Sequence, residues 1–103
     1  MERVAIENLD AEAFAGLVGS EFSLRTAAGA AVAELVELNR YPAVPGAEAF
    51  SLVFRVAAEP APGQGMQELE HTVLGGFELF LVPVGATPEG VLLEAVFNRL
   101  AGA

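Results

Sequence analysis

Residues 66–99 hold three short segments rich in valine, leucine and phenylalanine, and they constrain the fold more than any other part of the chain. Glycine and proline clusters separate these segments, as turns separate successive strands. The middle segment, Phe77 to Val84, is apolar on both sides of the pleat and has one charge, at Glu78. A strand that is apolar on both faces is normally covered on both faces. The pattern therefore predicts a central strand, with Phe80 buried as deeply as Phe54.

Three further strands are predicted upstream, where apolar and polar residues alternate. They are Glu21 to Thr26, Ala31 to Tyr41 and Ala49 to Ala57. Before them, Ala11 to Val18 has helical spacing, with Asp10 as its N-cap and Gly19 as its stop. Because the chain has little room for crossover helices, neighbouring strands should pair antiparallel. The predicted fold is mainly β: one domain over residues 1–103, an antiparallel six-stranded meander or small barrel with one short N-terminal helix.

Three local features modify these strands. The adjacent apolar residues Leu35 and Val36 break the alternation, which indicates a β-bulge or cover on both faces. Pro83 lacks the amide hydrogen that a strand ladder uses, so its strand should end, bulge or face an unpaired edge there. Gly75-Gly76, between two predicted strands, is typical of a hairpin turn.

Charge and composition exclude several functions. The net charge is -9, and the five basic residues are scattered arginines, so phosphates would repel the chain; nucleic acid and anionic membranes are not expected partners. Without cysteine there is no disulfide, zinc thiolate site or thiol nucleophile. One histidine cannot build a typical catalytic zinc site, and no metal or other cofactor is expected. The chain has no signal-peptide pattern and no run of about 20 apolar residues, which predicts a cytoplasmic protein.

His71, the only histidine, is the first candidate site residue. It could act as a general base or a metal ligand. The alternative is a histidine that is hydrogen-bonded in the core or at its edge. A Ser-His-Asp triad would need Asp10, the only aspartate. Its serine would be Ser20, Ser23 or Ser51, and no Gly-x-Ser-x-Gly turn presents any of them.

Carboxylates and arginines supply the other candidates. Four glutamates could converge across neighbouring strands: Glu68, Glu70, Glu78 and Glu94. Paired carboxylates can act as general acid and base or hold a hard cation, whereas the alternation around Glu68 and Glu70 favours a solvated face. Arg99 could bind a carboxylate or phosphate bidentately, or form a structural ion pair with a glutamate.

Four ordered motifs resemble a family of small, uncharacterised bacterial single-domain proteins. The motifs are Phe50-Ser51-Leu52-Val53-Phe54-Arg55, Leu69-Glu70-His71, the run LGGFELFLVPVG at 74–85 and the run EAVFNR at 94–99. The opening is also similar to that of the family at Leu9, Phe14, Leu17, Val18 and Gly19, so the resemblance covers nearly the whole chain. The family is catalogued as a domain of unknown function, and the resemblance implies no activity. The resemblance also implies that the chain is similar to accessory proteins encoded beside phage-tail-like collar genes.

A well-patterned core without a recognisable catalytic set favours a non-enzymatic structural or interaction module. It would act by self-association or by docking on another protein, as an accessory to a phage-tail-like assembly. The alternative is a small-ligand-binding or enzymatic barrel with a site near His71, Glu78 and Arg99. Hydrophobic residues make up 53% of the chain when its 11 glycines are not counted. In typical globular domains the apolar share is only ~45–50% even when glycine is counted as apolar. This excess predicts a homodimer or higher homo-oligomer.

Overall fold

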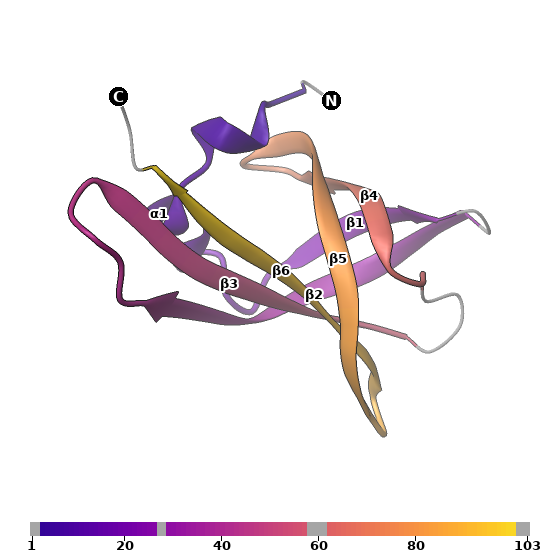
Figure 1. Ribbon diagram of the computed structural model, residues 1–103. Helices are drawn as coiled ribbons and strands as arrows, with labels where there is room; N and C mark the ends of the chain where they lie inside the picture. The colour runs from indigo at the N-terminus through magenta and orange to yellow at the C-terminus, as the bar shows by residue number, and fades with distance from the viewer. Residues whose placement is uncertain (1–2, 27–28, 58–61, 101–103) are drawn as a thin grey trace.

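The structure is a computed structural model that describes residues 3–26, 29–57 and 62–100. Within these residues six strands form one antiparallel sheet, preceded by a single turn of 3-10 helix and one short α-helix (Figure 1). The elements are η1 (Ile6–Asn8), α1 (Ala11–Ala15), β1 (Glu21–Thr26), β2 (Gly29–Tyr41), β3 (Ala47–Val56), β4 (Gly65–His71), β5 (Gly75–Thr87) and β6 (Gly90–Leu100). The predicted class, mainly antiparallel β with one short N-terminal helix, is confirmed.

The sheet consists of two units, β1-β2-β3 and β4-β5-β6, and in each unit successive strands are joined by hairpins. They join edge to edge at β3 with β6 and at β1 with β4, so the sheet closes on itself in the order β1-β2-β3-β6-β5-β4. The β3–β6 seam is long and runs from Ala47 opposite Leu100 to Val56 opposite Val91. The β1–β4 seam has only three residue pairs, ending at Ser23 opposite Glu70. The strand order therefore departs from a simple meander at these two seams.

Alternate residues of each strand fill the interior of this ring with large apolar side chains. The fully buried set includes Phe22, Phe50, Phe54, Phe77, Leu24, Leu35, Leu52, Leu69, Leu81 and Leu93. Phe14 of α1 enters the same core, with its ring centroid 6.5 Å from that of Phe50, 5.9 Å from Phe77 and 6.4 Å from Phe97. The N-terminal helix thus closes one end of the ring, where Figure 1 places α1 and η1.

The helix is shorter than predicted. Asp10 is its N-cap as expected, with its carboxylate accepting a hydrogen bond from the Ala13 amide at 2.9 Å. However, α1 ends at Ala15, and Gly16 is the C-cap. The reason lies just downstream: the Gly19 amide donates to Leu35 O at 2.7 Å and the Leu35 amide donates to Ser20 O at 3.0 Å. The chain must already run beside β2 at this point, so a helix through Val18 would remove those bonds.

The interpretation of β5 as a strand covered on both faces is wrong. Phe77, Leu79 and Leu81 point inward and are buried, but Phe80 is 49% exposed on the outside of the sheet. A closed single sheet has one interior, and no second layer of described residues covers the outer face of β5. Apolar residues on both sides of this strand therefore mark a core face and an exposed apolar face.

The local predictions have mixed outcomes. The β2–β3 register shifts between Leu35 and Glu37, which confirms the bulge, and the β5–β6 register shifts between Pro83 and Gly85, as proline requires. Gly75-Gly76 is not the hairpin turn. That turn covers residues 72–74; Gly75, with φ of +92°, opens β5 directly after it. Glycine is needed there because other residues adopt such a φ only with strain.

Candidate functional site

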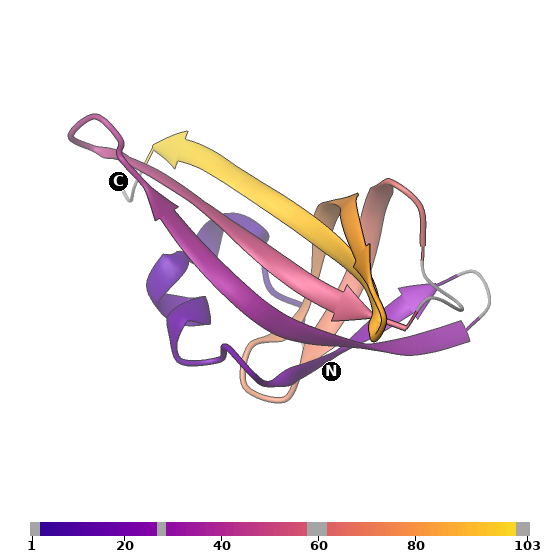
Figure 2. The ribbon, with the colours of Figure 1, turned by 90° about the horizontal axis from the view of Figure 1, so that it is seen from below.

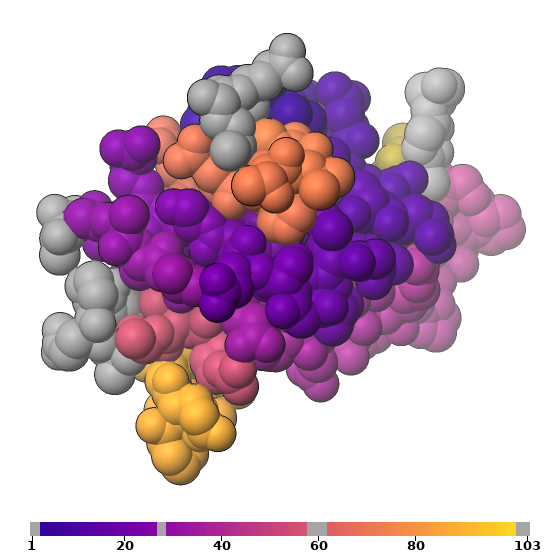
Figure 3. Space-filling model, turned by 180° about the vertical axis from the view of Figure 1, so that it is seen from behind, coloured from indigo at the N-terminus to yellow at the C-terminus, as the bar shows by residue number. Residues whose placement is uncertain are grey.

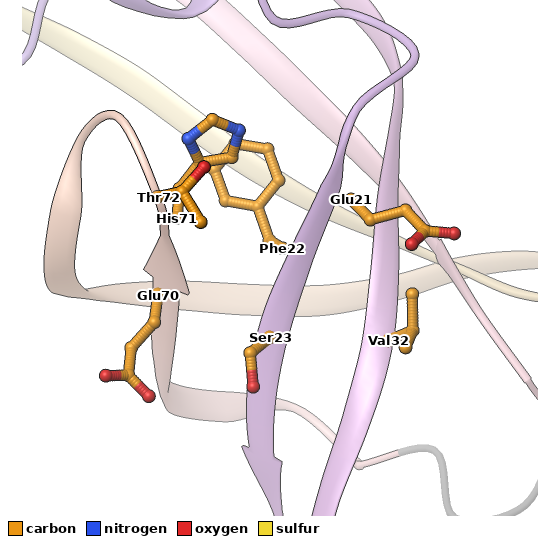
Figure 4. Close-up of a pocket in the computed structure, with 7 residues that line it drawn as sticks. All are labelled: Glu21, Phe22, Ser23, Val32, Glu70, His71 and Thr72. Atoms are coloured by element: carbon orange, nitrogen blue, oxygen red, sulfur yellow. The ribbon is translucent and has the colours of Figure 1, made fainter. Parts of the chain in front are cut away.

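His71 ends β4 beside the short β1–β4 seam. Its side chain points inward and is only 6% exposed. The imidazole lies over the ring of Phe22 from β1, with the ring centroids 4.5 Å apart (Figure 4). Burial lowers the pKa of His71 below its ordinary value of 6.5, so the ring is neutral at pH 7.

Three hydrogen bonds fix the tautomer of this imidazole. The Val73 backbone amide donates to Nδ1 at 3.0 Å, so Nδ1 is unprotonated and the neutral ring carries its hydrogen on Nε2. Nε2 lies 3.2 Å from Oγ of Ser20 and donates to it. The Ser20 hydroxyl donates in turn to the Leu17 carbonyl at 2.6 Å. This chain of bonds joins the end of β4 to the segment that connects α1 to β1.

The same chain decides what the Ser20–His71 contact can do. A histidine that activates a serine must accept the hydroxyl proton on Nε2 while Nδ1–H donates to a carboxylate. Here the proton is on Nε2, and a backbone amide occupies Nδ1. Asp10, the only aspartate, caps α1 instead. The geometry fits a histidine hydrogen-bonded at the edge of the core, and not a nucleophile–base pair.

The lowered pKa predicts how stability depends on pH. Between the folded pKa and the unfolded value near 6.5, the unfolded chain binds one more proton at His71 than the folded chain does. The free energy of unfolding should therefore fall as pH drops below about 6.5, by at most about 1.4 kcal/mol per pH unit, until the folded pKa is passed. Urea midpoints at pH 7.5, 6.5 and 5.5 measure this loss.

His71→Gln is the matched variant for that experiment. It should be less stable at every pH but should lack the part of the decline that His71 causes. An equal decline in both proteins would assign the pH dependence to other groups.

A shallow hollow of about 300 Å³ lies outside His71 (Figure 4). Its lining is Glu21, Phe22, Ser23, Val32, Glu70, His71 and Thr72. Figure 4 shows the side chains of Glu21 and Glu70 pointing away from one another, on either side of Ser23. They do not converge on a common point as an acid–base pair or a cation site requires. Among the residues that the structure describes, no three His, Asp or Glu side chains group so that they could hold a metal ion.

Glu78 and Arg99 lie apart from this hollow. Glu78 is on the outer face of β5, 3.3 Å from the guanidinium of Arg3, and lines a different hollow of about 370 Å³ together with residues 3–7 and Met66. Arg99 lines neither of the two hollows. The structure therefore does not bring His71, Glu78 and Arg99 together around one cavity.

Arg99 binds the chain's own N-terminal segment. Its guanidinium donates to the carbonyls of Ile6, at 3.1 Å, and Leu9 and pairs with Glu48 at 3.4 Å. It also lies over the rings of Phe50 and Phe97, 5.6 and 5.2 Å from their centroids. These contacts fasten η1 to the open end of the ring. No sequence pattern pointed to the two carbonyls, because they lie 90 or more residues away in the chain.

Together these features define a class: a small closed antiparallel β domain that is sealed by its N-terminal segment and keeps its one histidine in a hydrogen-bonded chain. The chain belongs to the family described as Domain of unknown function (DUF6916), whose model matches residues 9–97. The resemblance that the motifs predicted is thereby confirmed. No curated protein and no solved structure matches the chain. Within its described residues, no helix is both long enough and apolar enough to cross a membrane.

Proposed function

We propose that this domain is a non-enzymatic structural or protein-interaction module that acts by self-association and by docking on other proteins. One observation carries the proposal: large apolar side chains remain exposed on the outside of the sheet. Those relevant here form two groups: Tyr41, Val44 and Leu100 at the β2–β3 hairpin end, and Met66, Phe80 and Val96 on the outside of β4, β5 and β6. Exposed apolar groups of this kind favour protein contacts.

The hairpin end suits contact with a second copy of the chain. Leu100 pairs with Ala47, next to the loop that carries Val44, and Val44 is 71% exposed. The charges nearby are already neutralised, because Arg40 pairs with Glu12 at 2.8 Å and Arg99 pairs with Glu48. A two-fold copy could cover this end without bringing like charges together.

We also propose that the module is an accessory to a phage-tail-like assembly. The support is the family likeness and the exposed apolar groups, which fit a protein that works through contacts with other chains. Proteins that co-purify with the domain from its native host test this part.

Self-association is the prediction that tests the module directly. Light scattering at micromolar concentration should give at least twice the 10.7 kDa chain mass. Val44→Asp should shift the mass toward that of the monomer, because it places a carboxylate in the apolar contact. Val73→Asp is the matched control, since Val73 is 74% exposed and lies in the turn between β4 and β5, outside the β2–β3 hairpin.

A monomer mass for the unaltered chain would contradict self-association. An equal shift with Val73→Asp would show that the hairpin end is not the contact.

A further inference from the structure

We propose that the outer surface of β4, β5 and β6 docks an extended, basic segment of a partner protein. This β4–β6 face consists of Met66, Phe80, Val82, Glu94 and Val96. The proposal rests on the proposed function, and it assigns to one surface a partner other than a second copy of the chain.

The residues of the β4–β6 face are neighbours by strand register. Met66 lies directly opposite Phe80 across β4 and β5, and Val82 lies opposite Glu94 across β5 and β6. Within one strand, residues two apart share a face, which adds Val96 beside Glu94. Met66, Phe80 and Val96 are 59%, 49% and 68% exposed. The face is therefore an apolar strip with one carboxylate in the middle.

Strand edges lie unpaired beside this strip. β5 and β6 pair from Thr87 opposite Gly90 only as far as Val82 opposite Glu94, and then they separate (Figures 1 and 2). Beyond that point residues 75–81 of β5 pair with β4, and residues 95–100 of β6 pair with β3. Within the described chain, one backbone hydrogen bond reaches the free edge of β5: the Gly76 carbonyl accepts from the Val4 amide at 2.7 Å, at the end of the strand against which η1 packs. Free edges of this kind bind extended segments through main-chain hydrogen bonds.

The charges select a basic occupant. Each of the five arginines forms an ion pair with a glutamate: Arg3 with Glu68 and Glu78, Arg25 with Glu68, Arg40 with Glu12, Arg55 with Glu34 and Arg99 with Glu48. In the part of the chain that the structure describes, the Glu94 carboxylate has no ion pair or hydrogen bond. Glu37 and Glu94 lie on the two sides of Val53, one in β2 and the other in β6. Within the same described residues, the Glu37 carboxylate also has no ion pair or hydrogen bond. A lysine or arginine from a partner complements these carboxylates.

A second copy of the chain fits the β4–β6 face less well than a basic segment does, because of the same charges. It would bring another Glu94 to an apolar strip that has no uncommitted cation, and the whole chain carries a charge of -9. Like charges brought together at an interface oppose association. A phosphate-bearing partner meets the same repulsion.

The test uses three capped nine-residue peptides and the full chain labelled with ¹⁵N, at low salt. One peptide alternates lysine and valine, the second alternates glutamate and valine, and the third is the lysine peptide with alternate amides N-methylated. The lysine peptide should shift the amide resonances of Phe80, Glu94 and Val96, and the other two should not. Phe80→Ser should weaken its binding about tenfold by removing the ring.

Charge variants separate docking from general attraction. Glu94→Gln should weaken binding about two- to fivefold, the effect of one exposed ion pair. Glu21→Gln is the matched control: Glu21 is an exposed glutamate on β1, has no ion pair among the described residues and lies outside the β4–β6 face. It should leave the affinity of the lysine peptide unchanged.

Several results would overturn the proposal. Equal binding of the lysine and glutamate peptides, or an equal loss with Glu21→Gln, would show that no docking face exists. Equal binding of the N-methylated peptide would exclude pairing with the strand edges. Concentration-dependent shifts of Phe80 and Val96 without peptide would assign the face to a second copy. If the lysine peptide fails while Val44→Asp dissociates an oligomer, this inference is wrong and the proposed function stands.

Discussion

Replacing Gly90 with alanine is expected to lower the free energy of unfolding by about 3 kcal/mol or more, from backbone strain and a steric clash together. Gly90 opens β6 with φ of +149°, a conformation that other residues rarely adopt. A Cβ atom at this position would lie 2.2 Å from the carbonyl oxygen of Val56 and 2.9 Å from its carbonyl carbon. Both are backbone atoms of the β3 end, so no side-chain rotation can relieve the contact.

Gly85→Ala is the control for this prediction. Gly85 lies in the same β5–β6 hairpin, which projects from the body of the molecule (Figure 3). A Cβ atom there would meet only Leu92 Cδ1, at 3.9 Å. Urea unfolding should show a small change, below about 1 kcal/mol, for Gly85→Ala. Equal losses for the two variants would mean that the end of β3 does not crowd Gly90.

Gly90 also shows which parts of the fold the sequence could not supply. From the sequence, Glu89-Gly90 is an ordinary turn between two apolar runs. The need for glycine comes from Val56, which meets Gly90 because β3 pairs with β6. That seam joins two hairpin units that are far apart in the chain, and local patterning has no information about such a pairing.

Features with local causes were predictable. The Asp10 cap, the bulge at Leu35 and the bulge after Pro83 each follow from a few neighbouring residues and are present in the structure. The length of α1 was not predictable, because hydrogen bonds from Gly19 and Ser20 to Leu35 end it. Local propensity fixed where the helix begins, and a long-range contact fixed where it ends.

For the candidate site, too, the sequence predicted what local residues determine and missed what long-range contacts determine. His71 shares one side of its predicted strand with Leu69 and Val73, and this was enough to suggest a histidine at the edge of the core. Its partner Ser20 lies 51 residues away, and no motif joins the two. Whether Nδ1 or Nε2 carries the proton depends on the Val73 amide, which takes its position from the turn after β4. The chemistry of this histidine is therefore a property of the fold.

Phe54→Ala should cost about 3–5 kcal/mol, because it removes a fully buried ring and leaves a cavity. Phe54 is 0% exposed, and its ring meets that of Phe22 edge to face at a centroid distance of 5.3 Å. Phe80, which the sequence suggested was equally buried, is 49% exposed. Phe80→Ala should therefore cost only about 1 kcal/mol, since truncating it opens no interior cavity.

The comparison of these two phenylalanines tests the division between the inner and outer faces of the sheet. Urea unfolding of both variants should give unchanged m-values, so that shifts of the midpoint report stability alone. It should be done with Val44→Asp in the background, so that loss of a self-association contact does not add to either value. A loss of 3 kcal/mol or more at Phe80 would mean that the outer face of β5 is covered within one chain. In that case the β4–β6 face could not be a docking surface. A loss below about 1 kcal/mol at Phe54 would contradict the ring's place in the core.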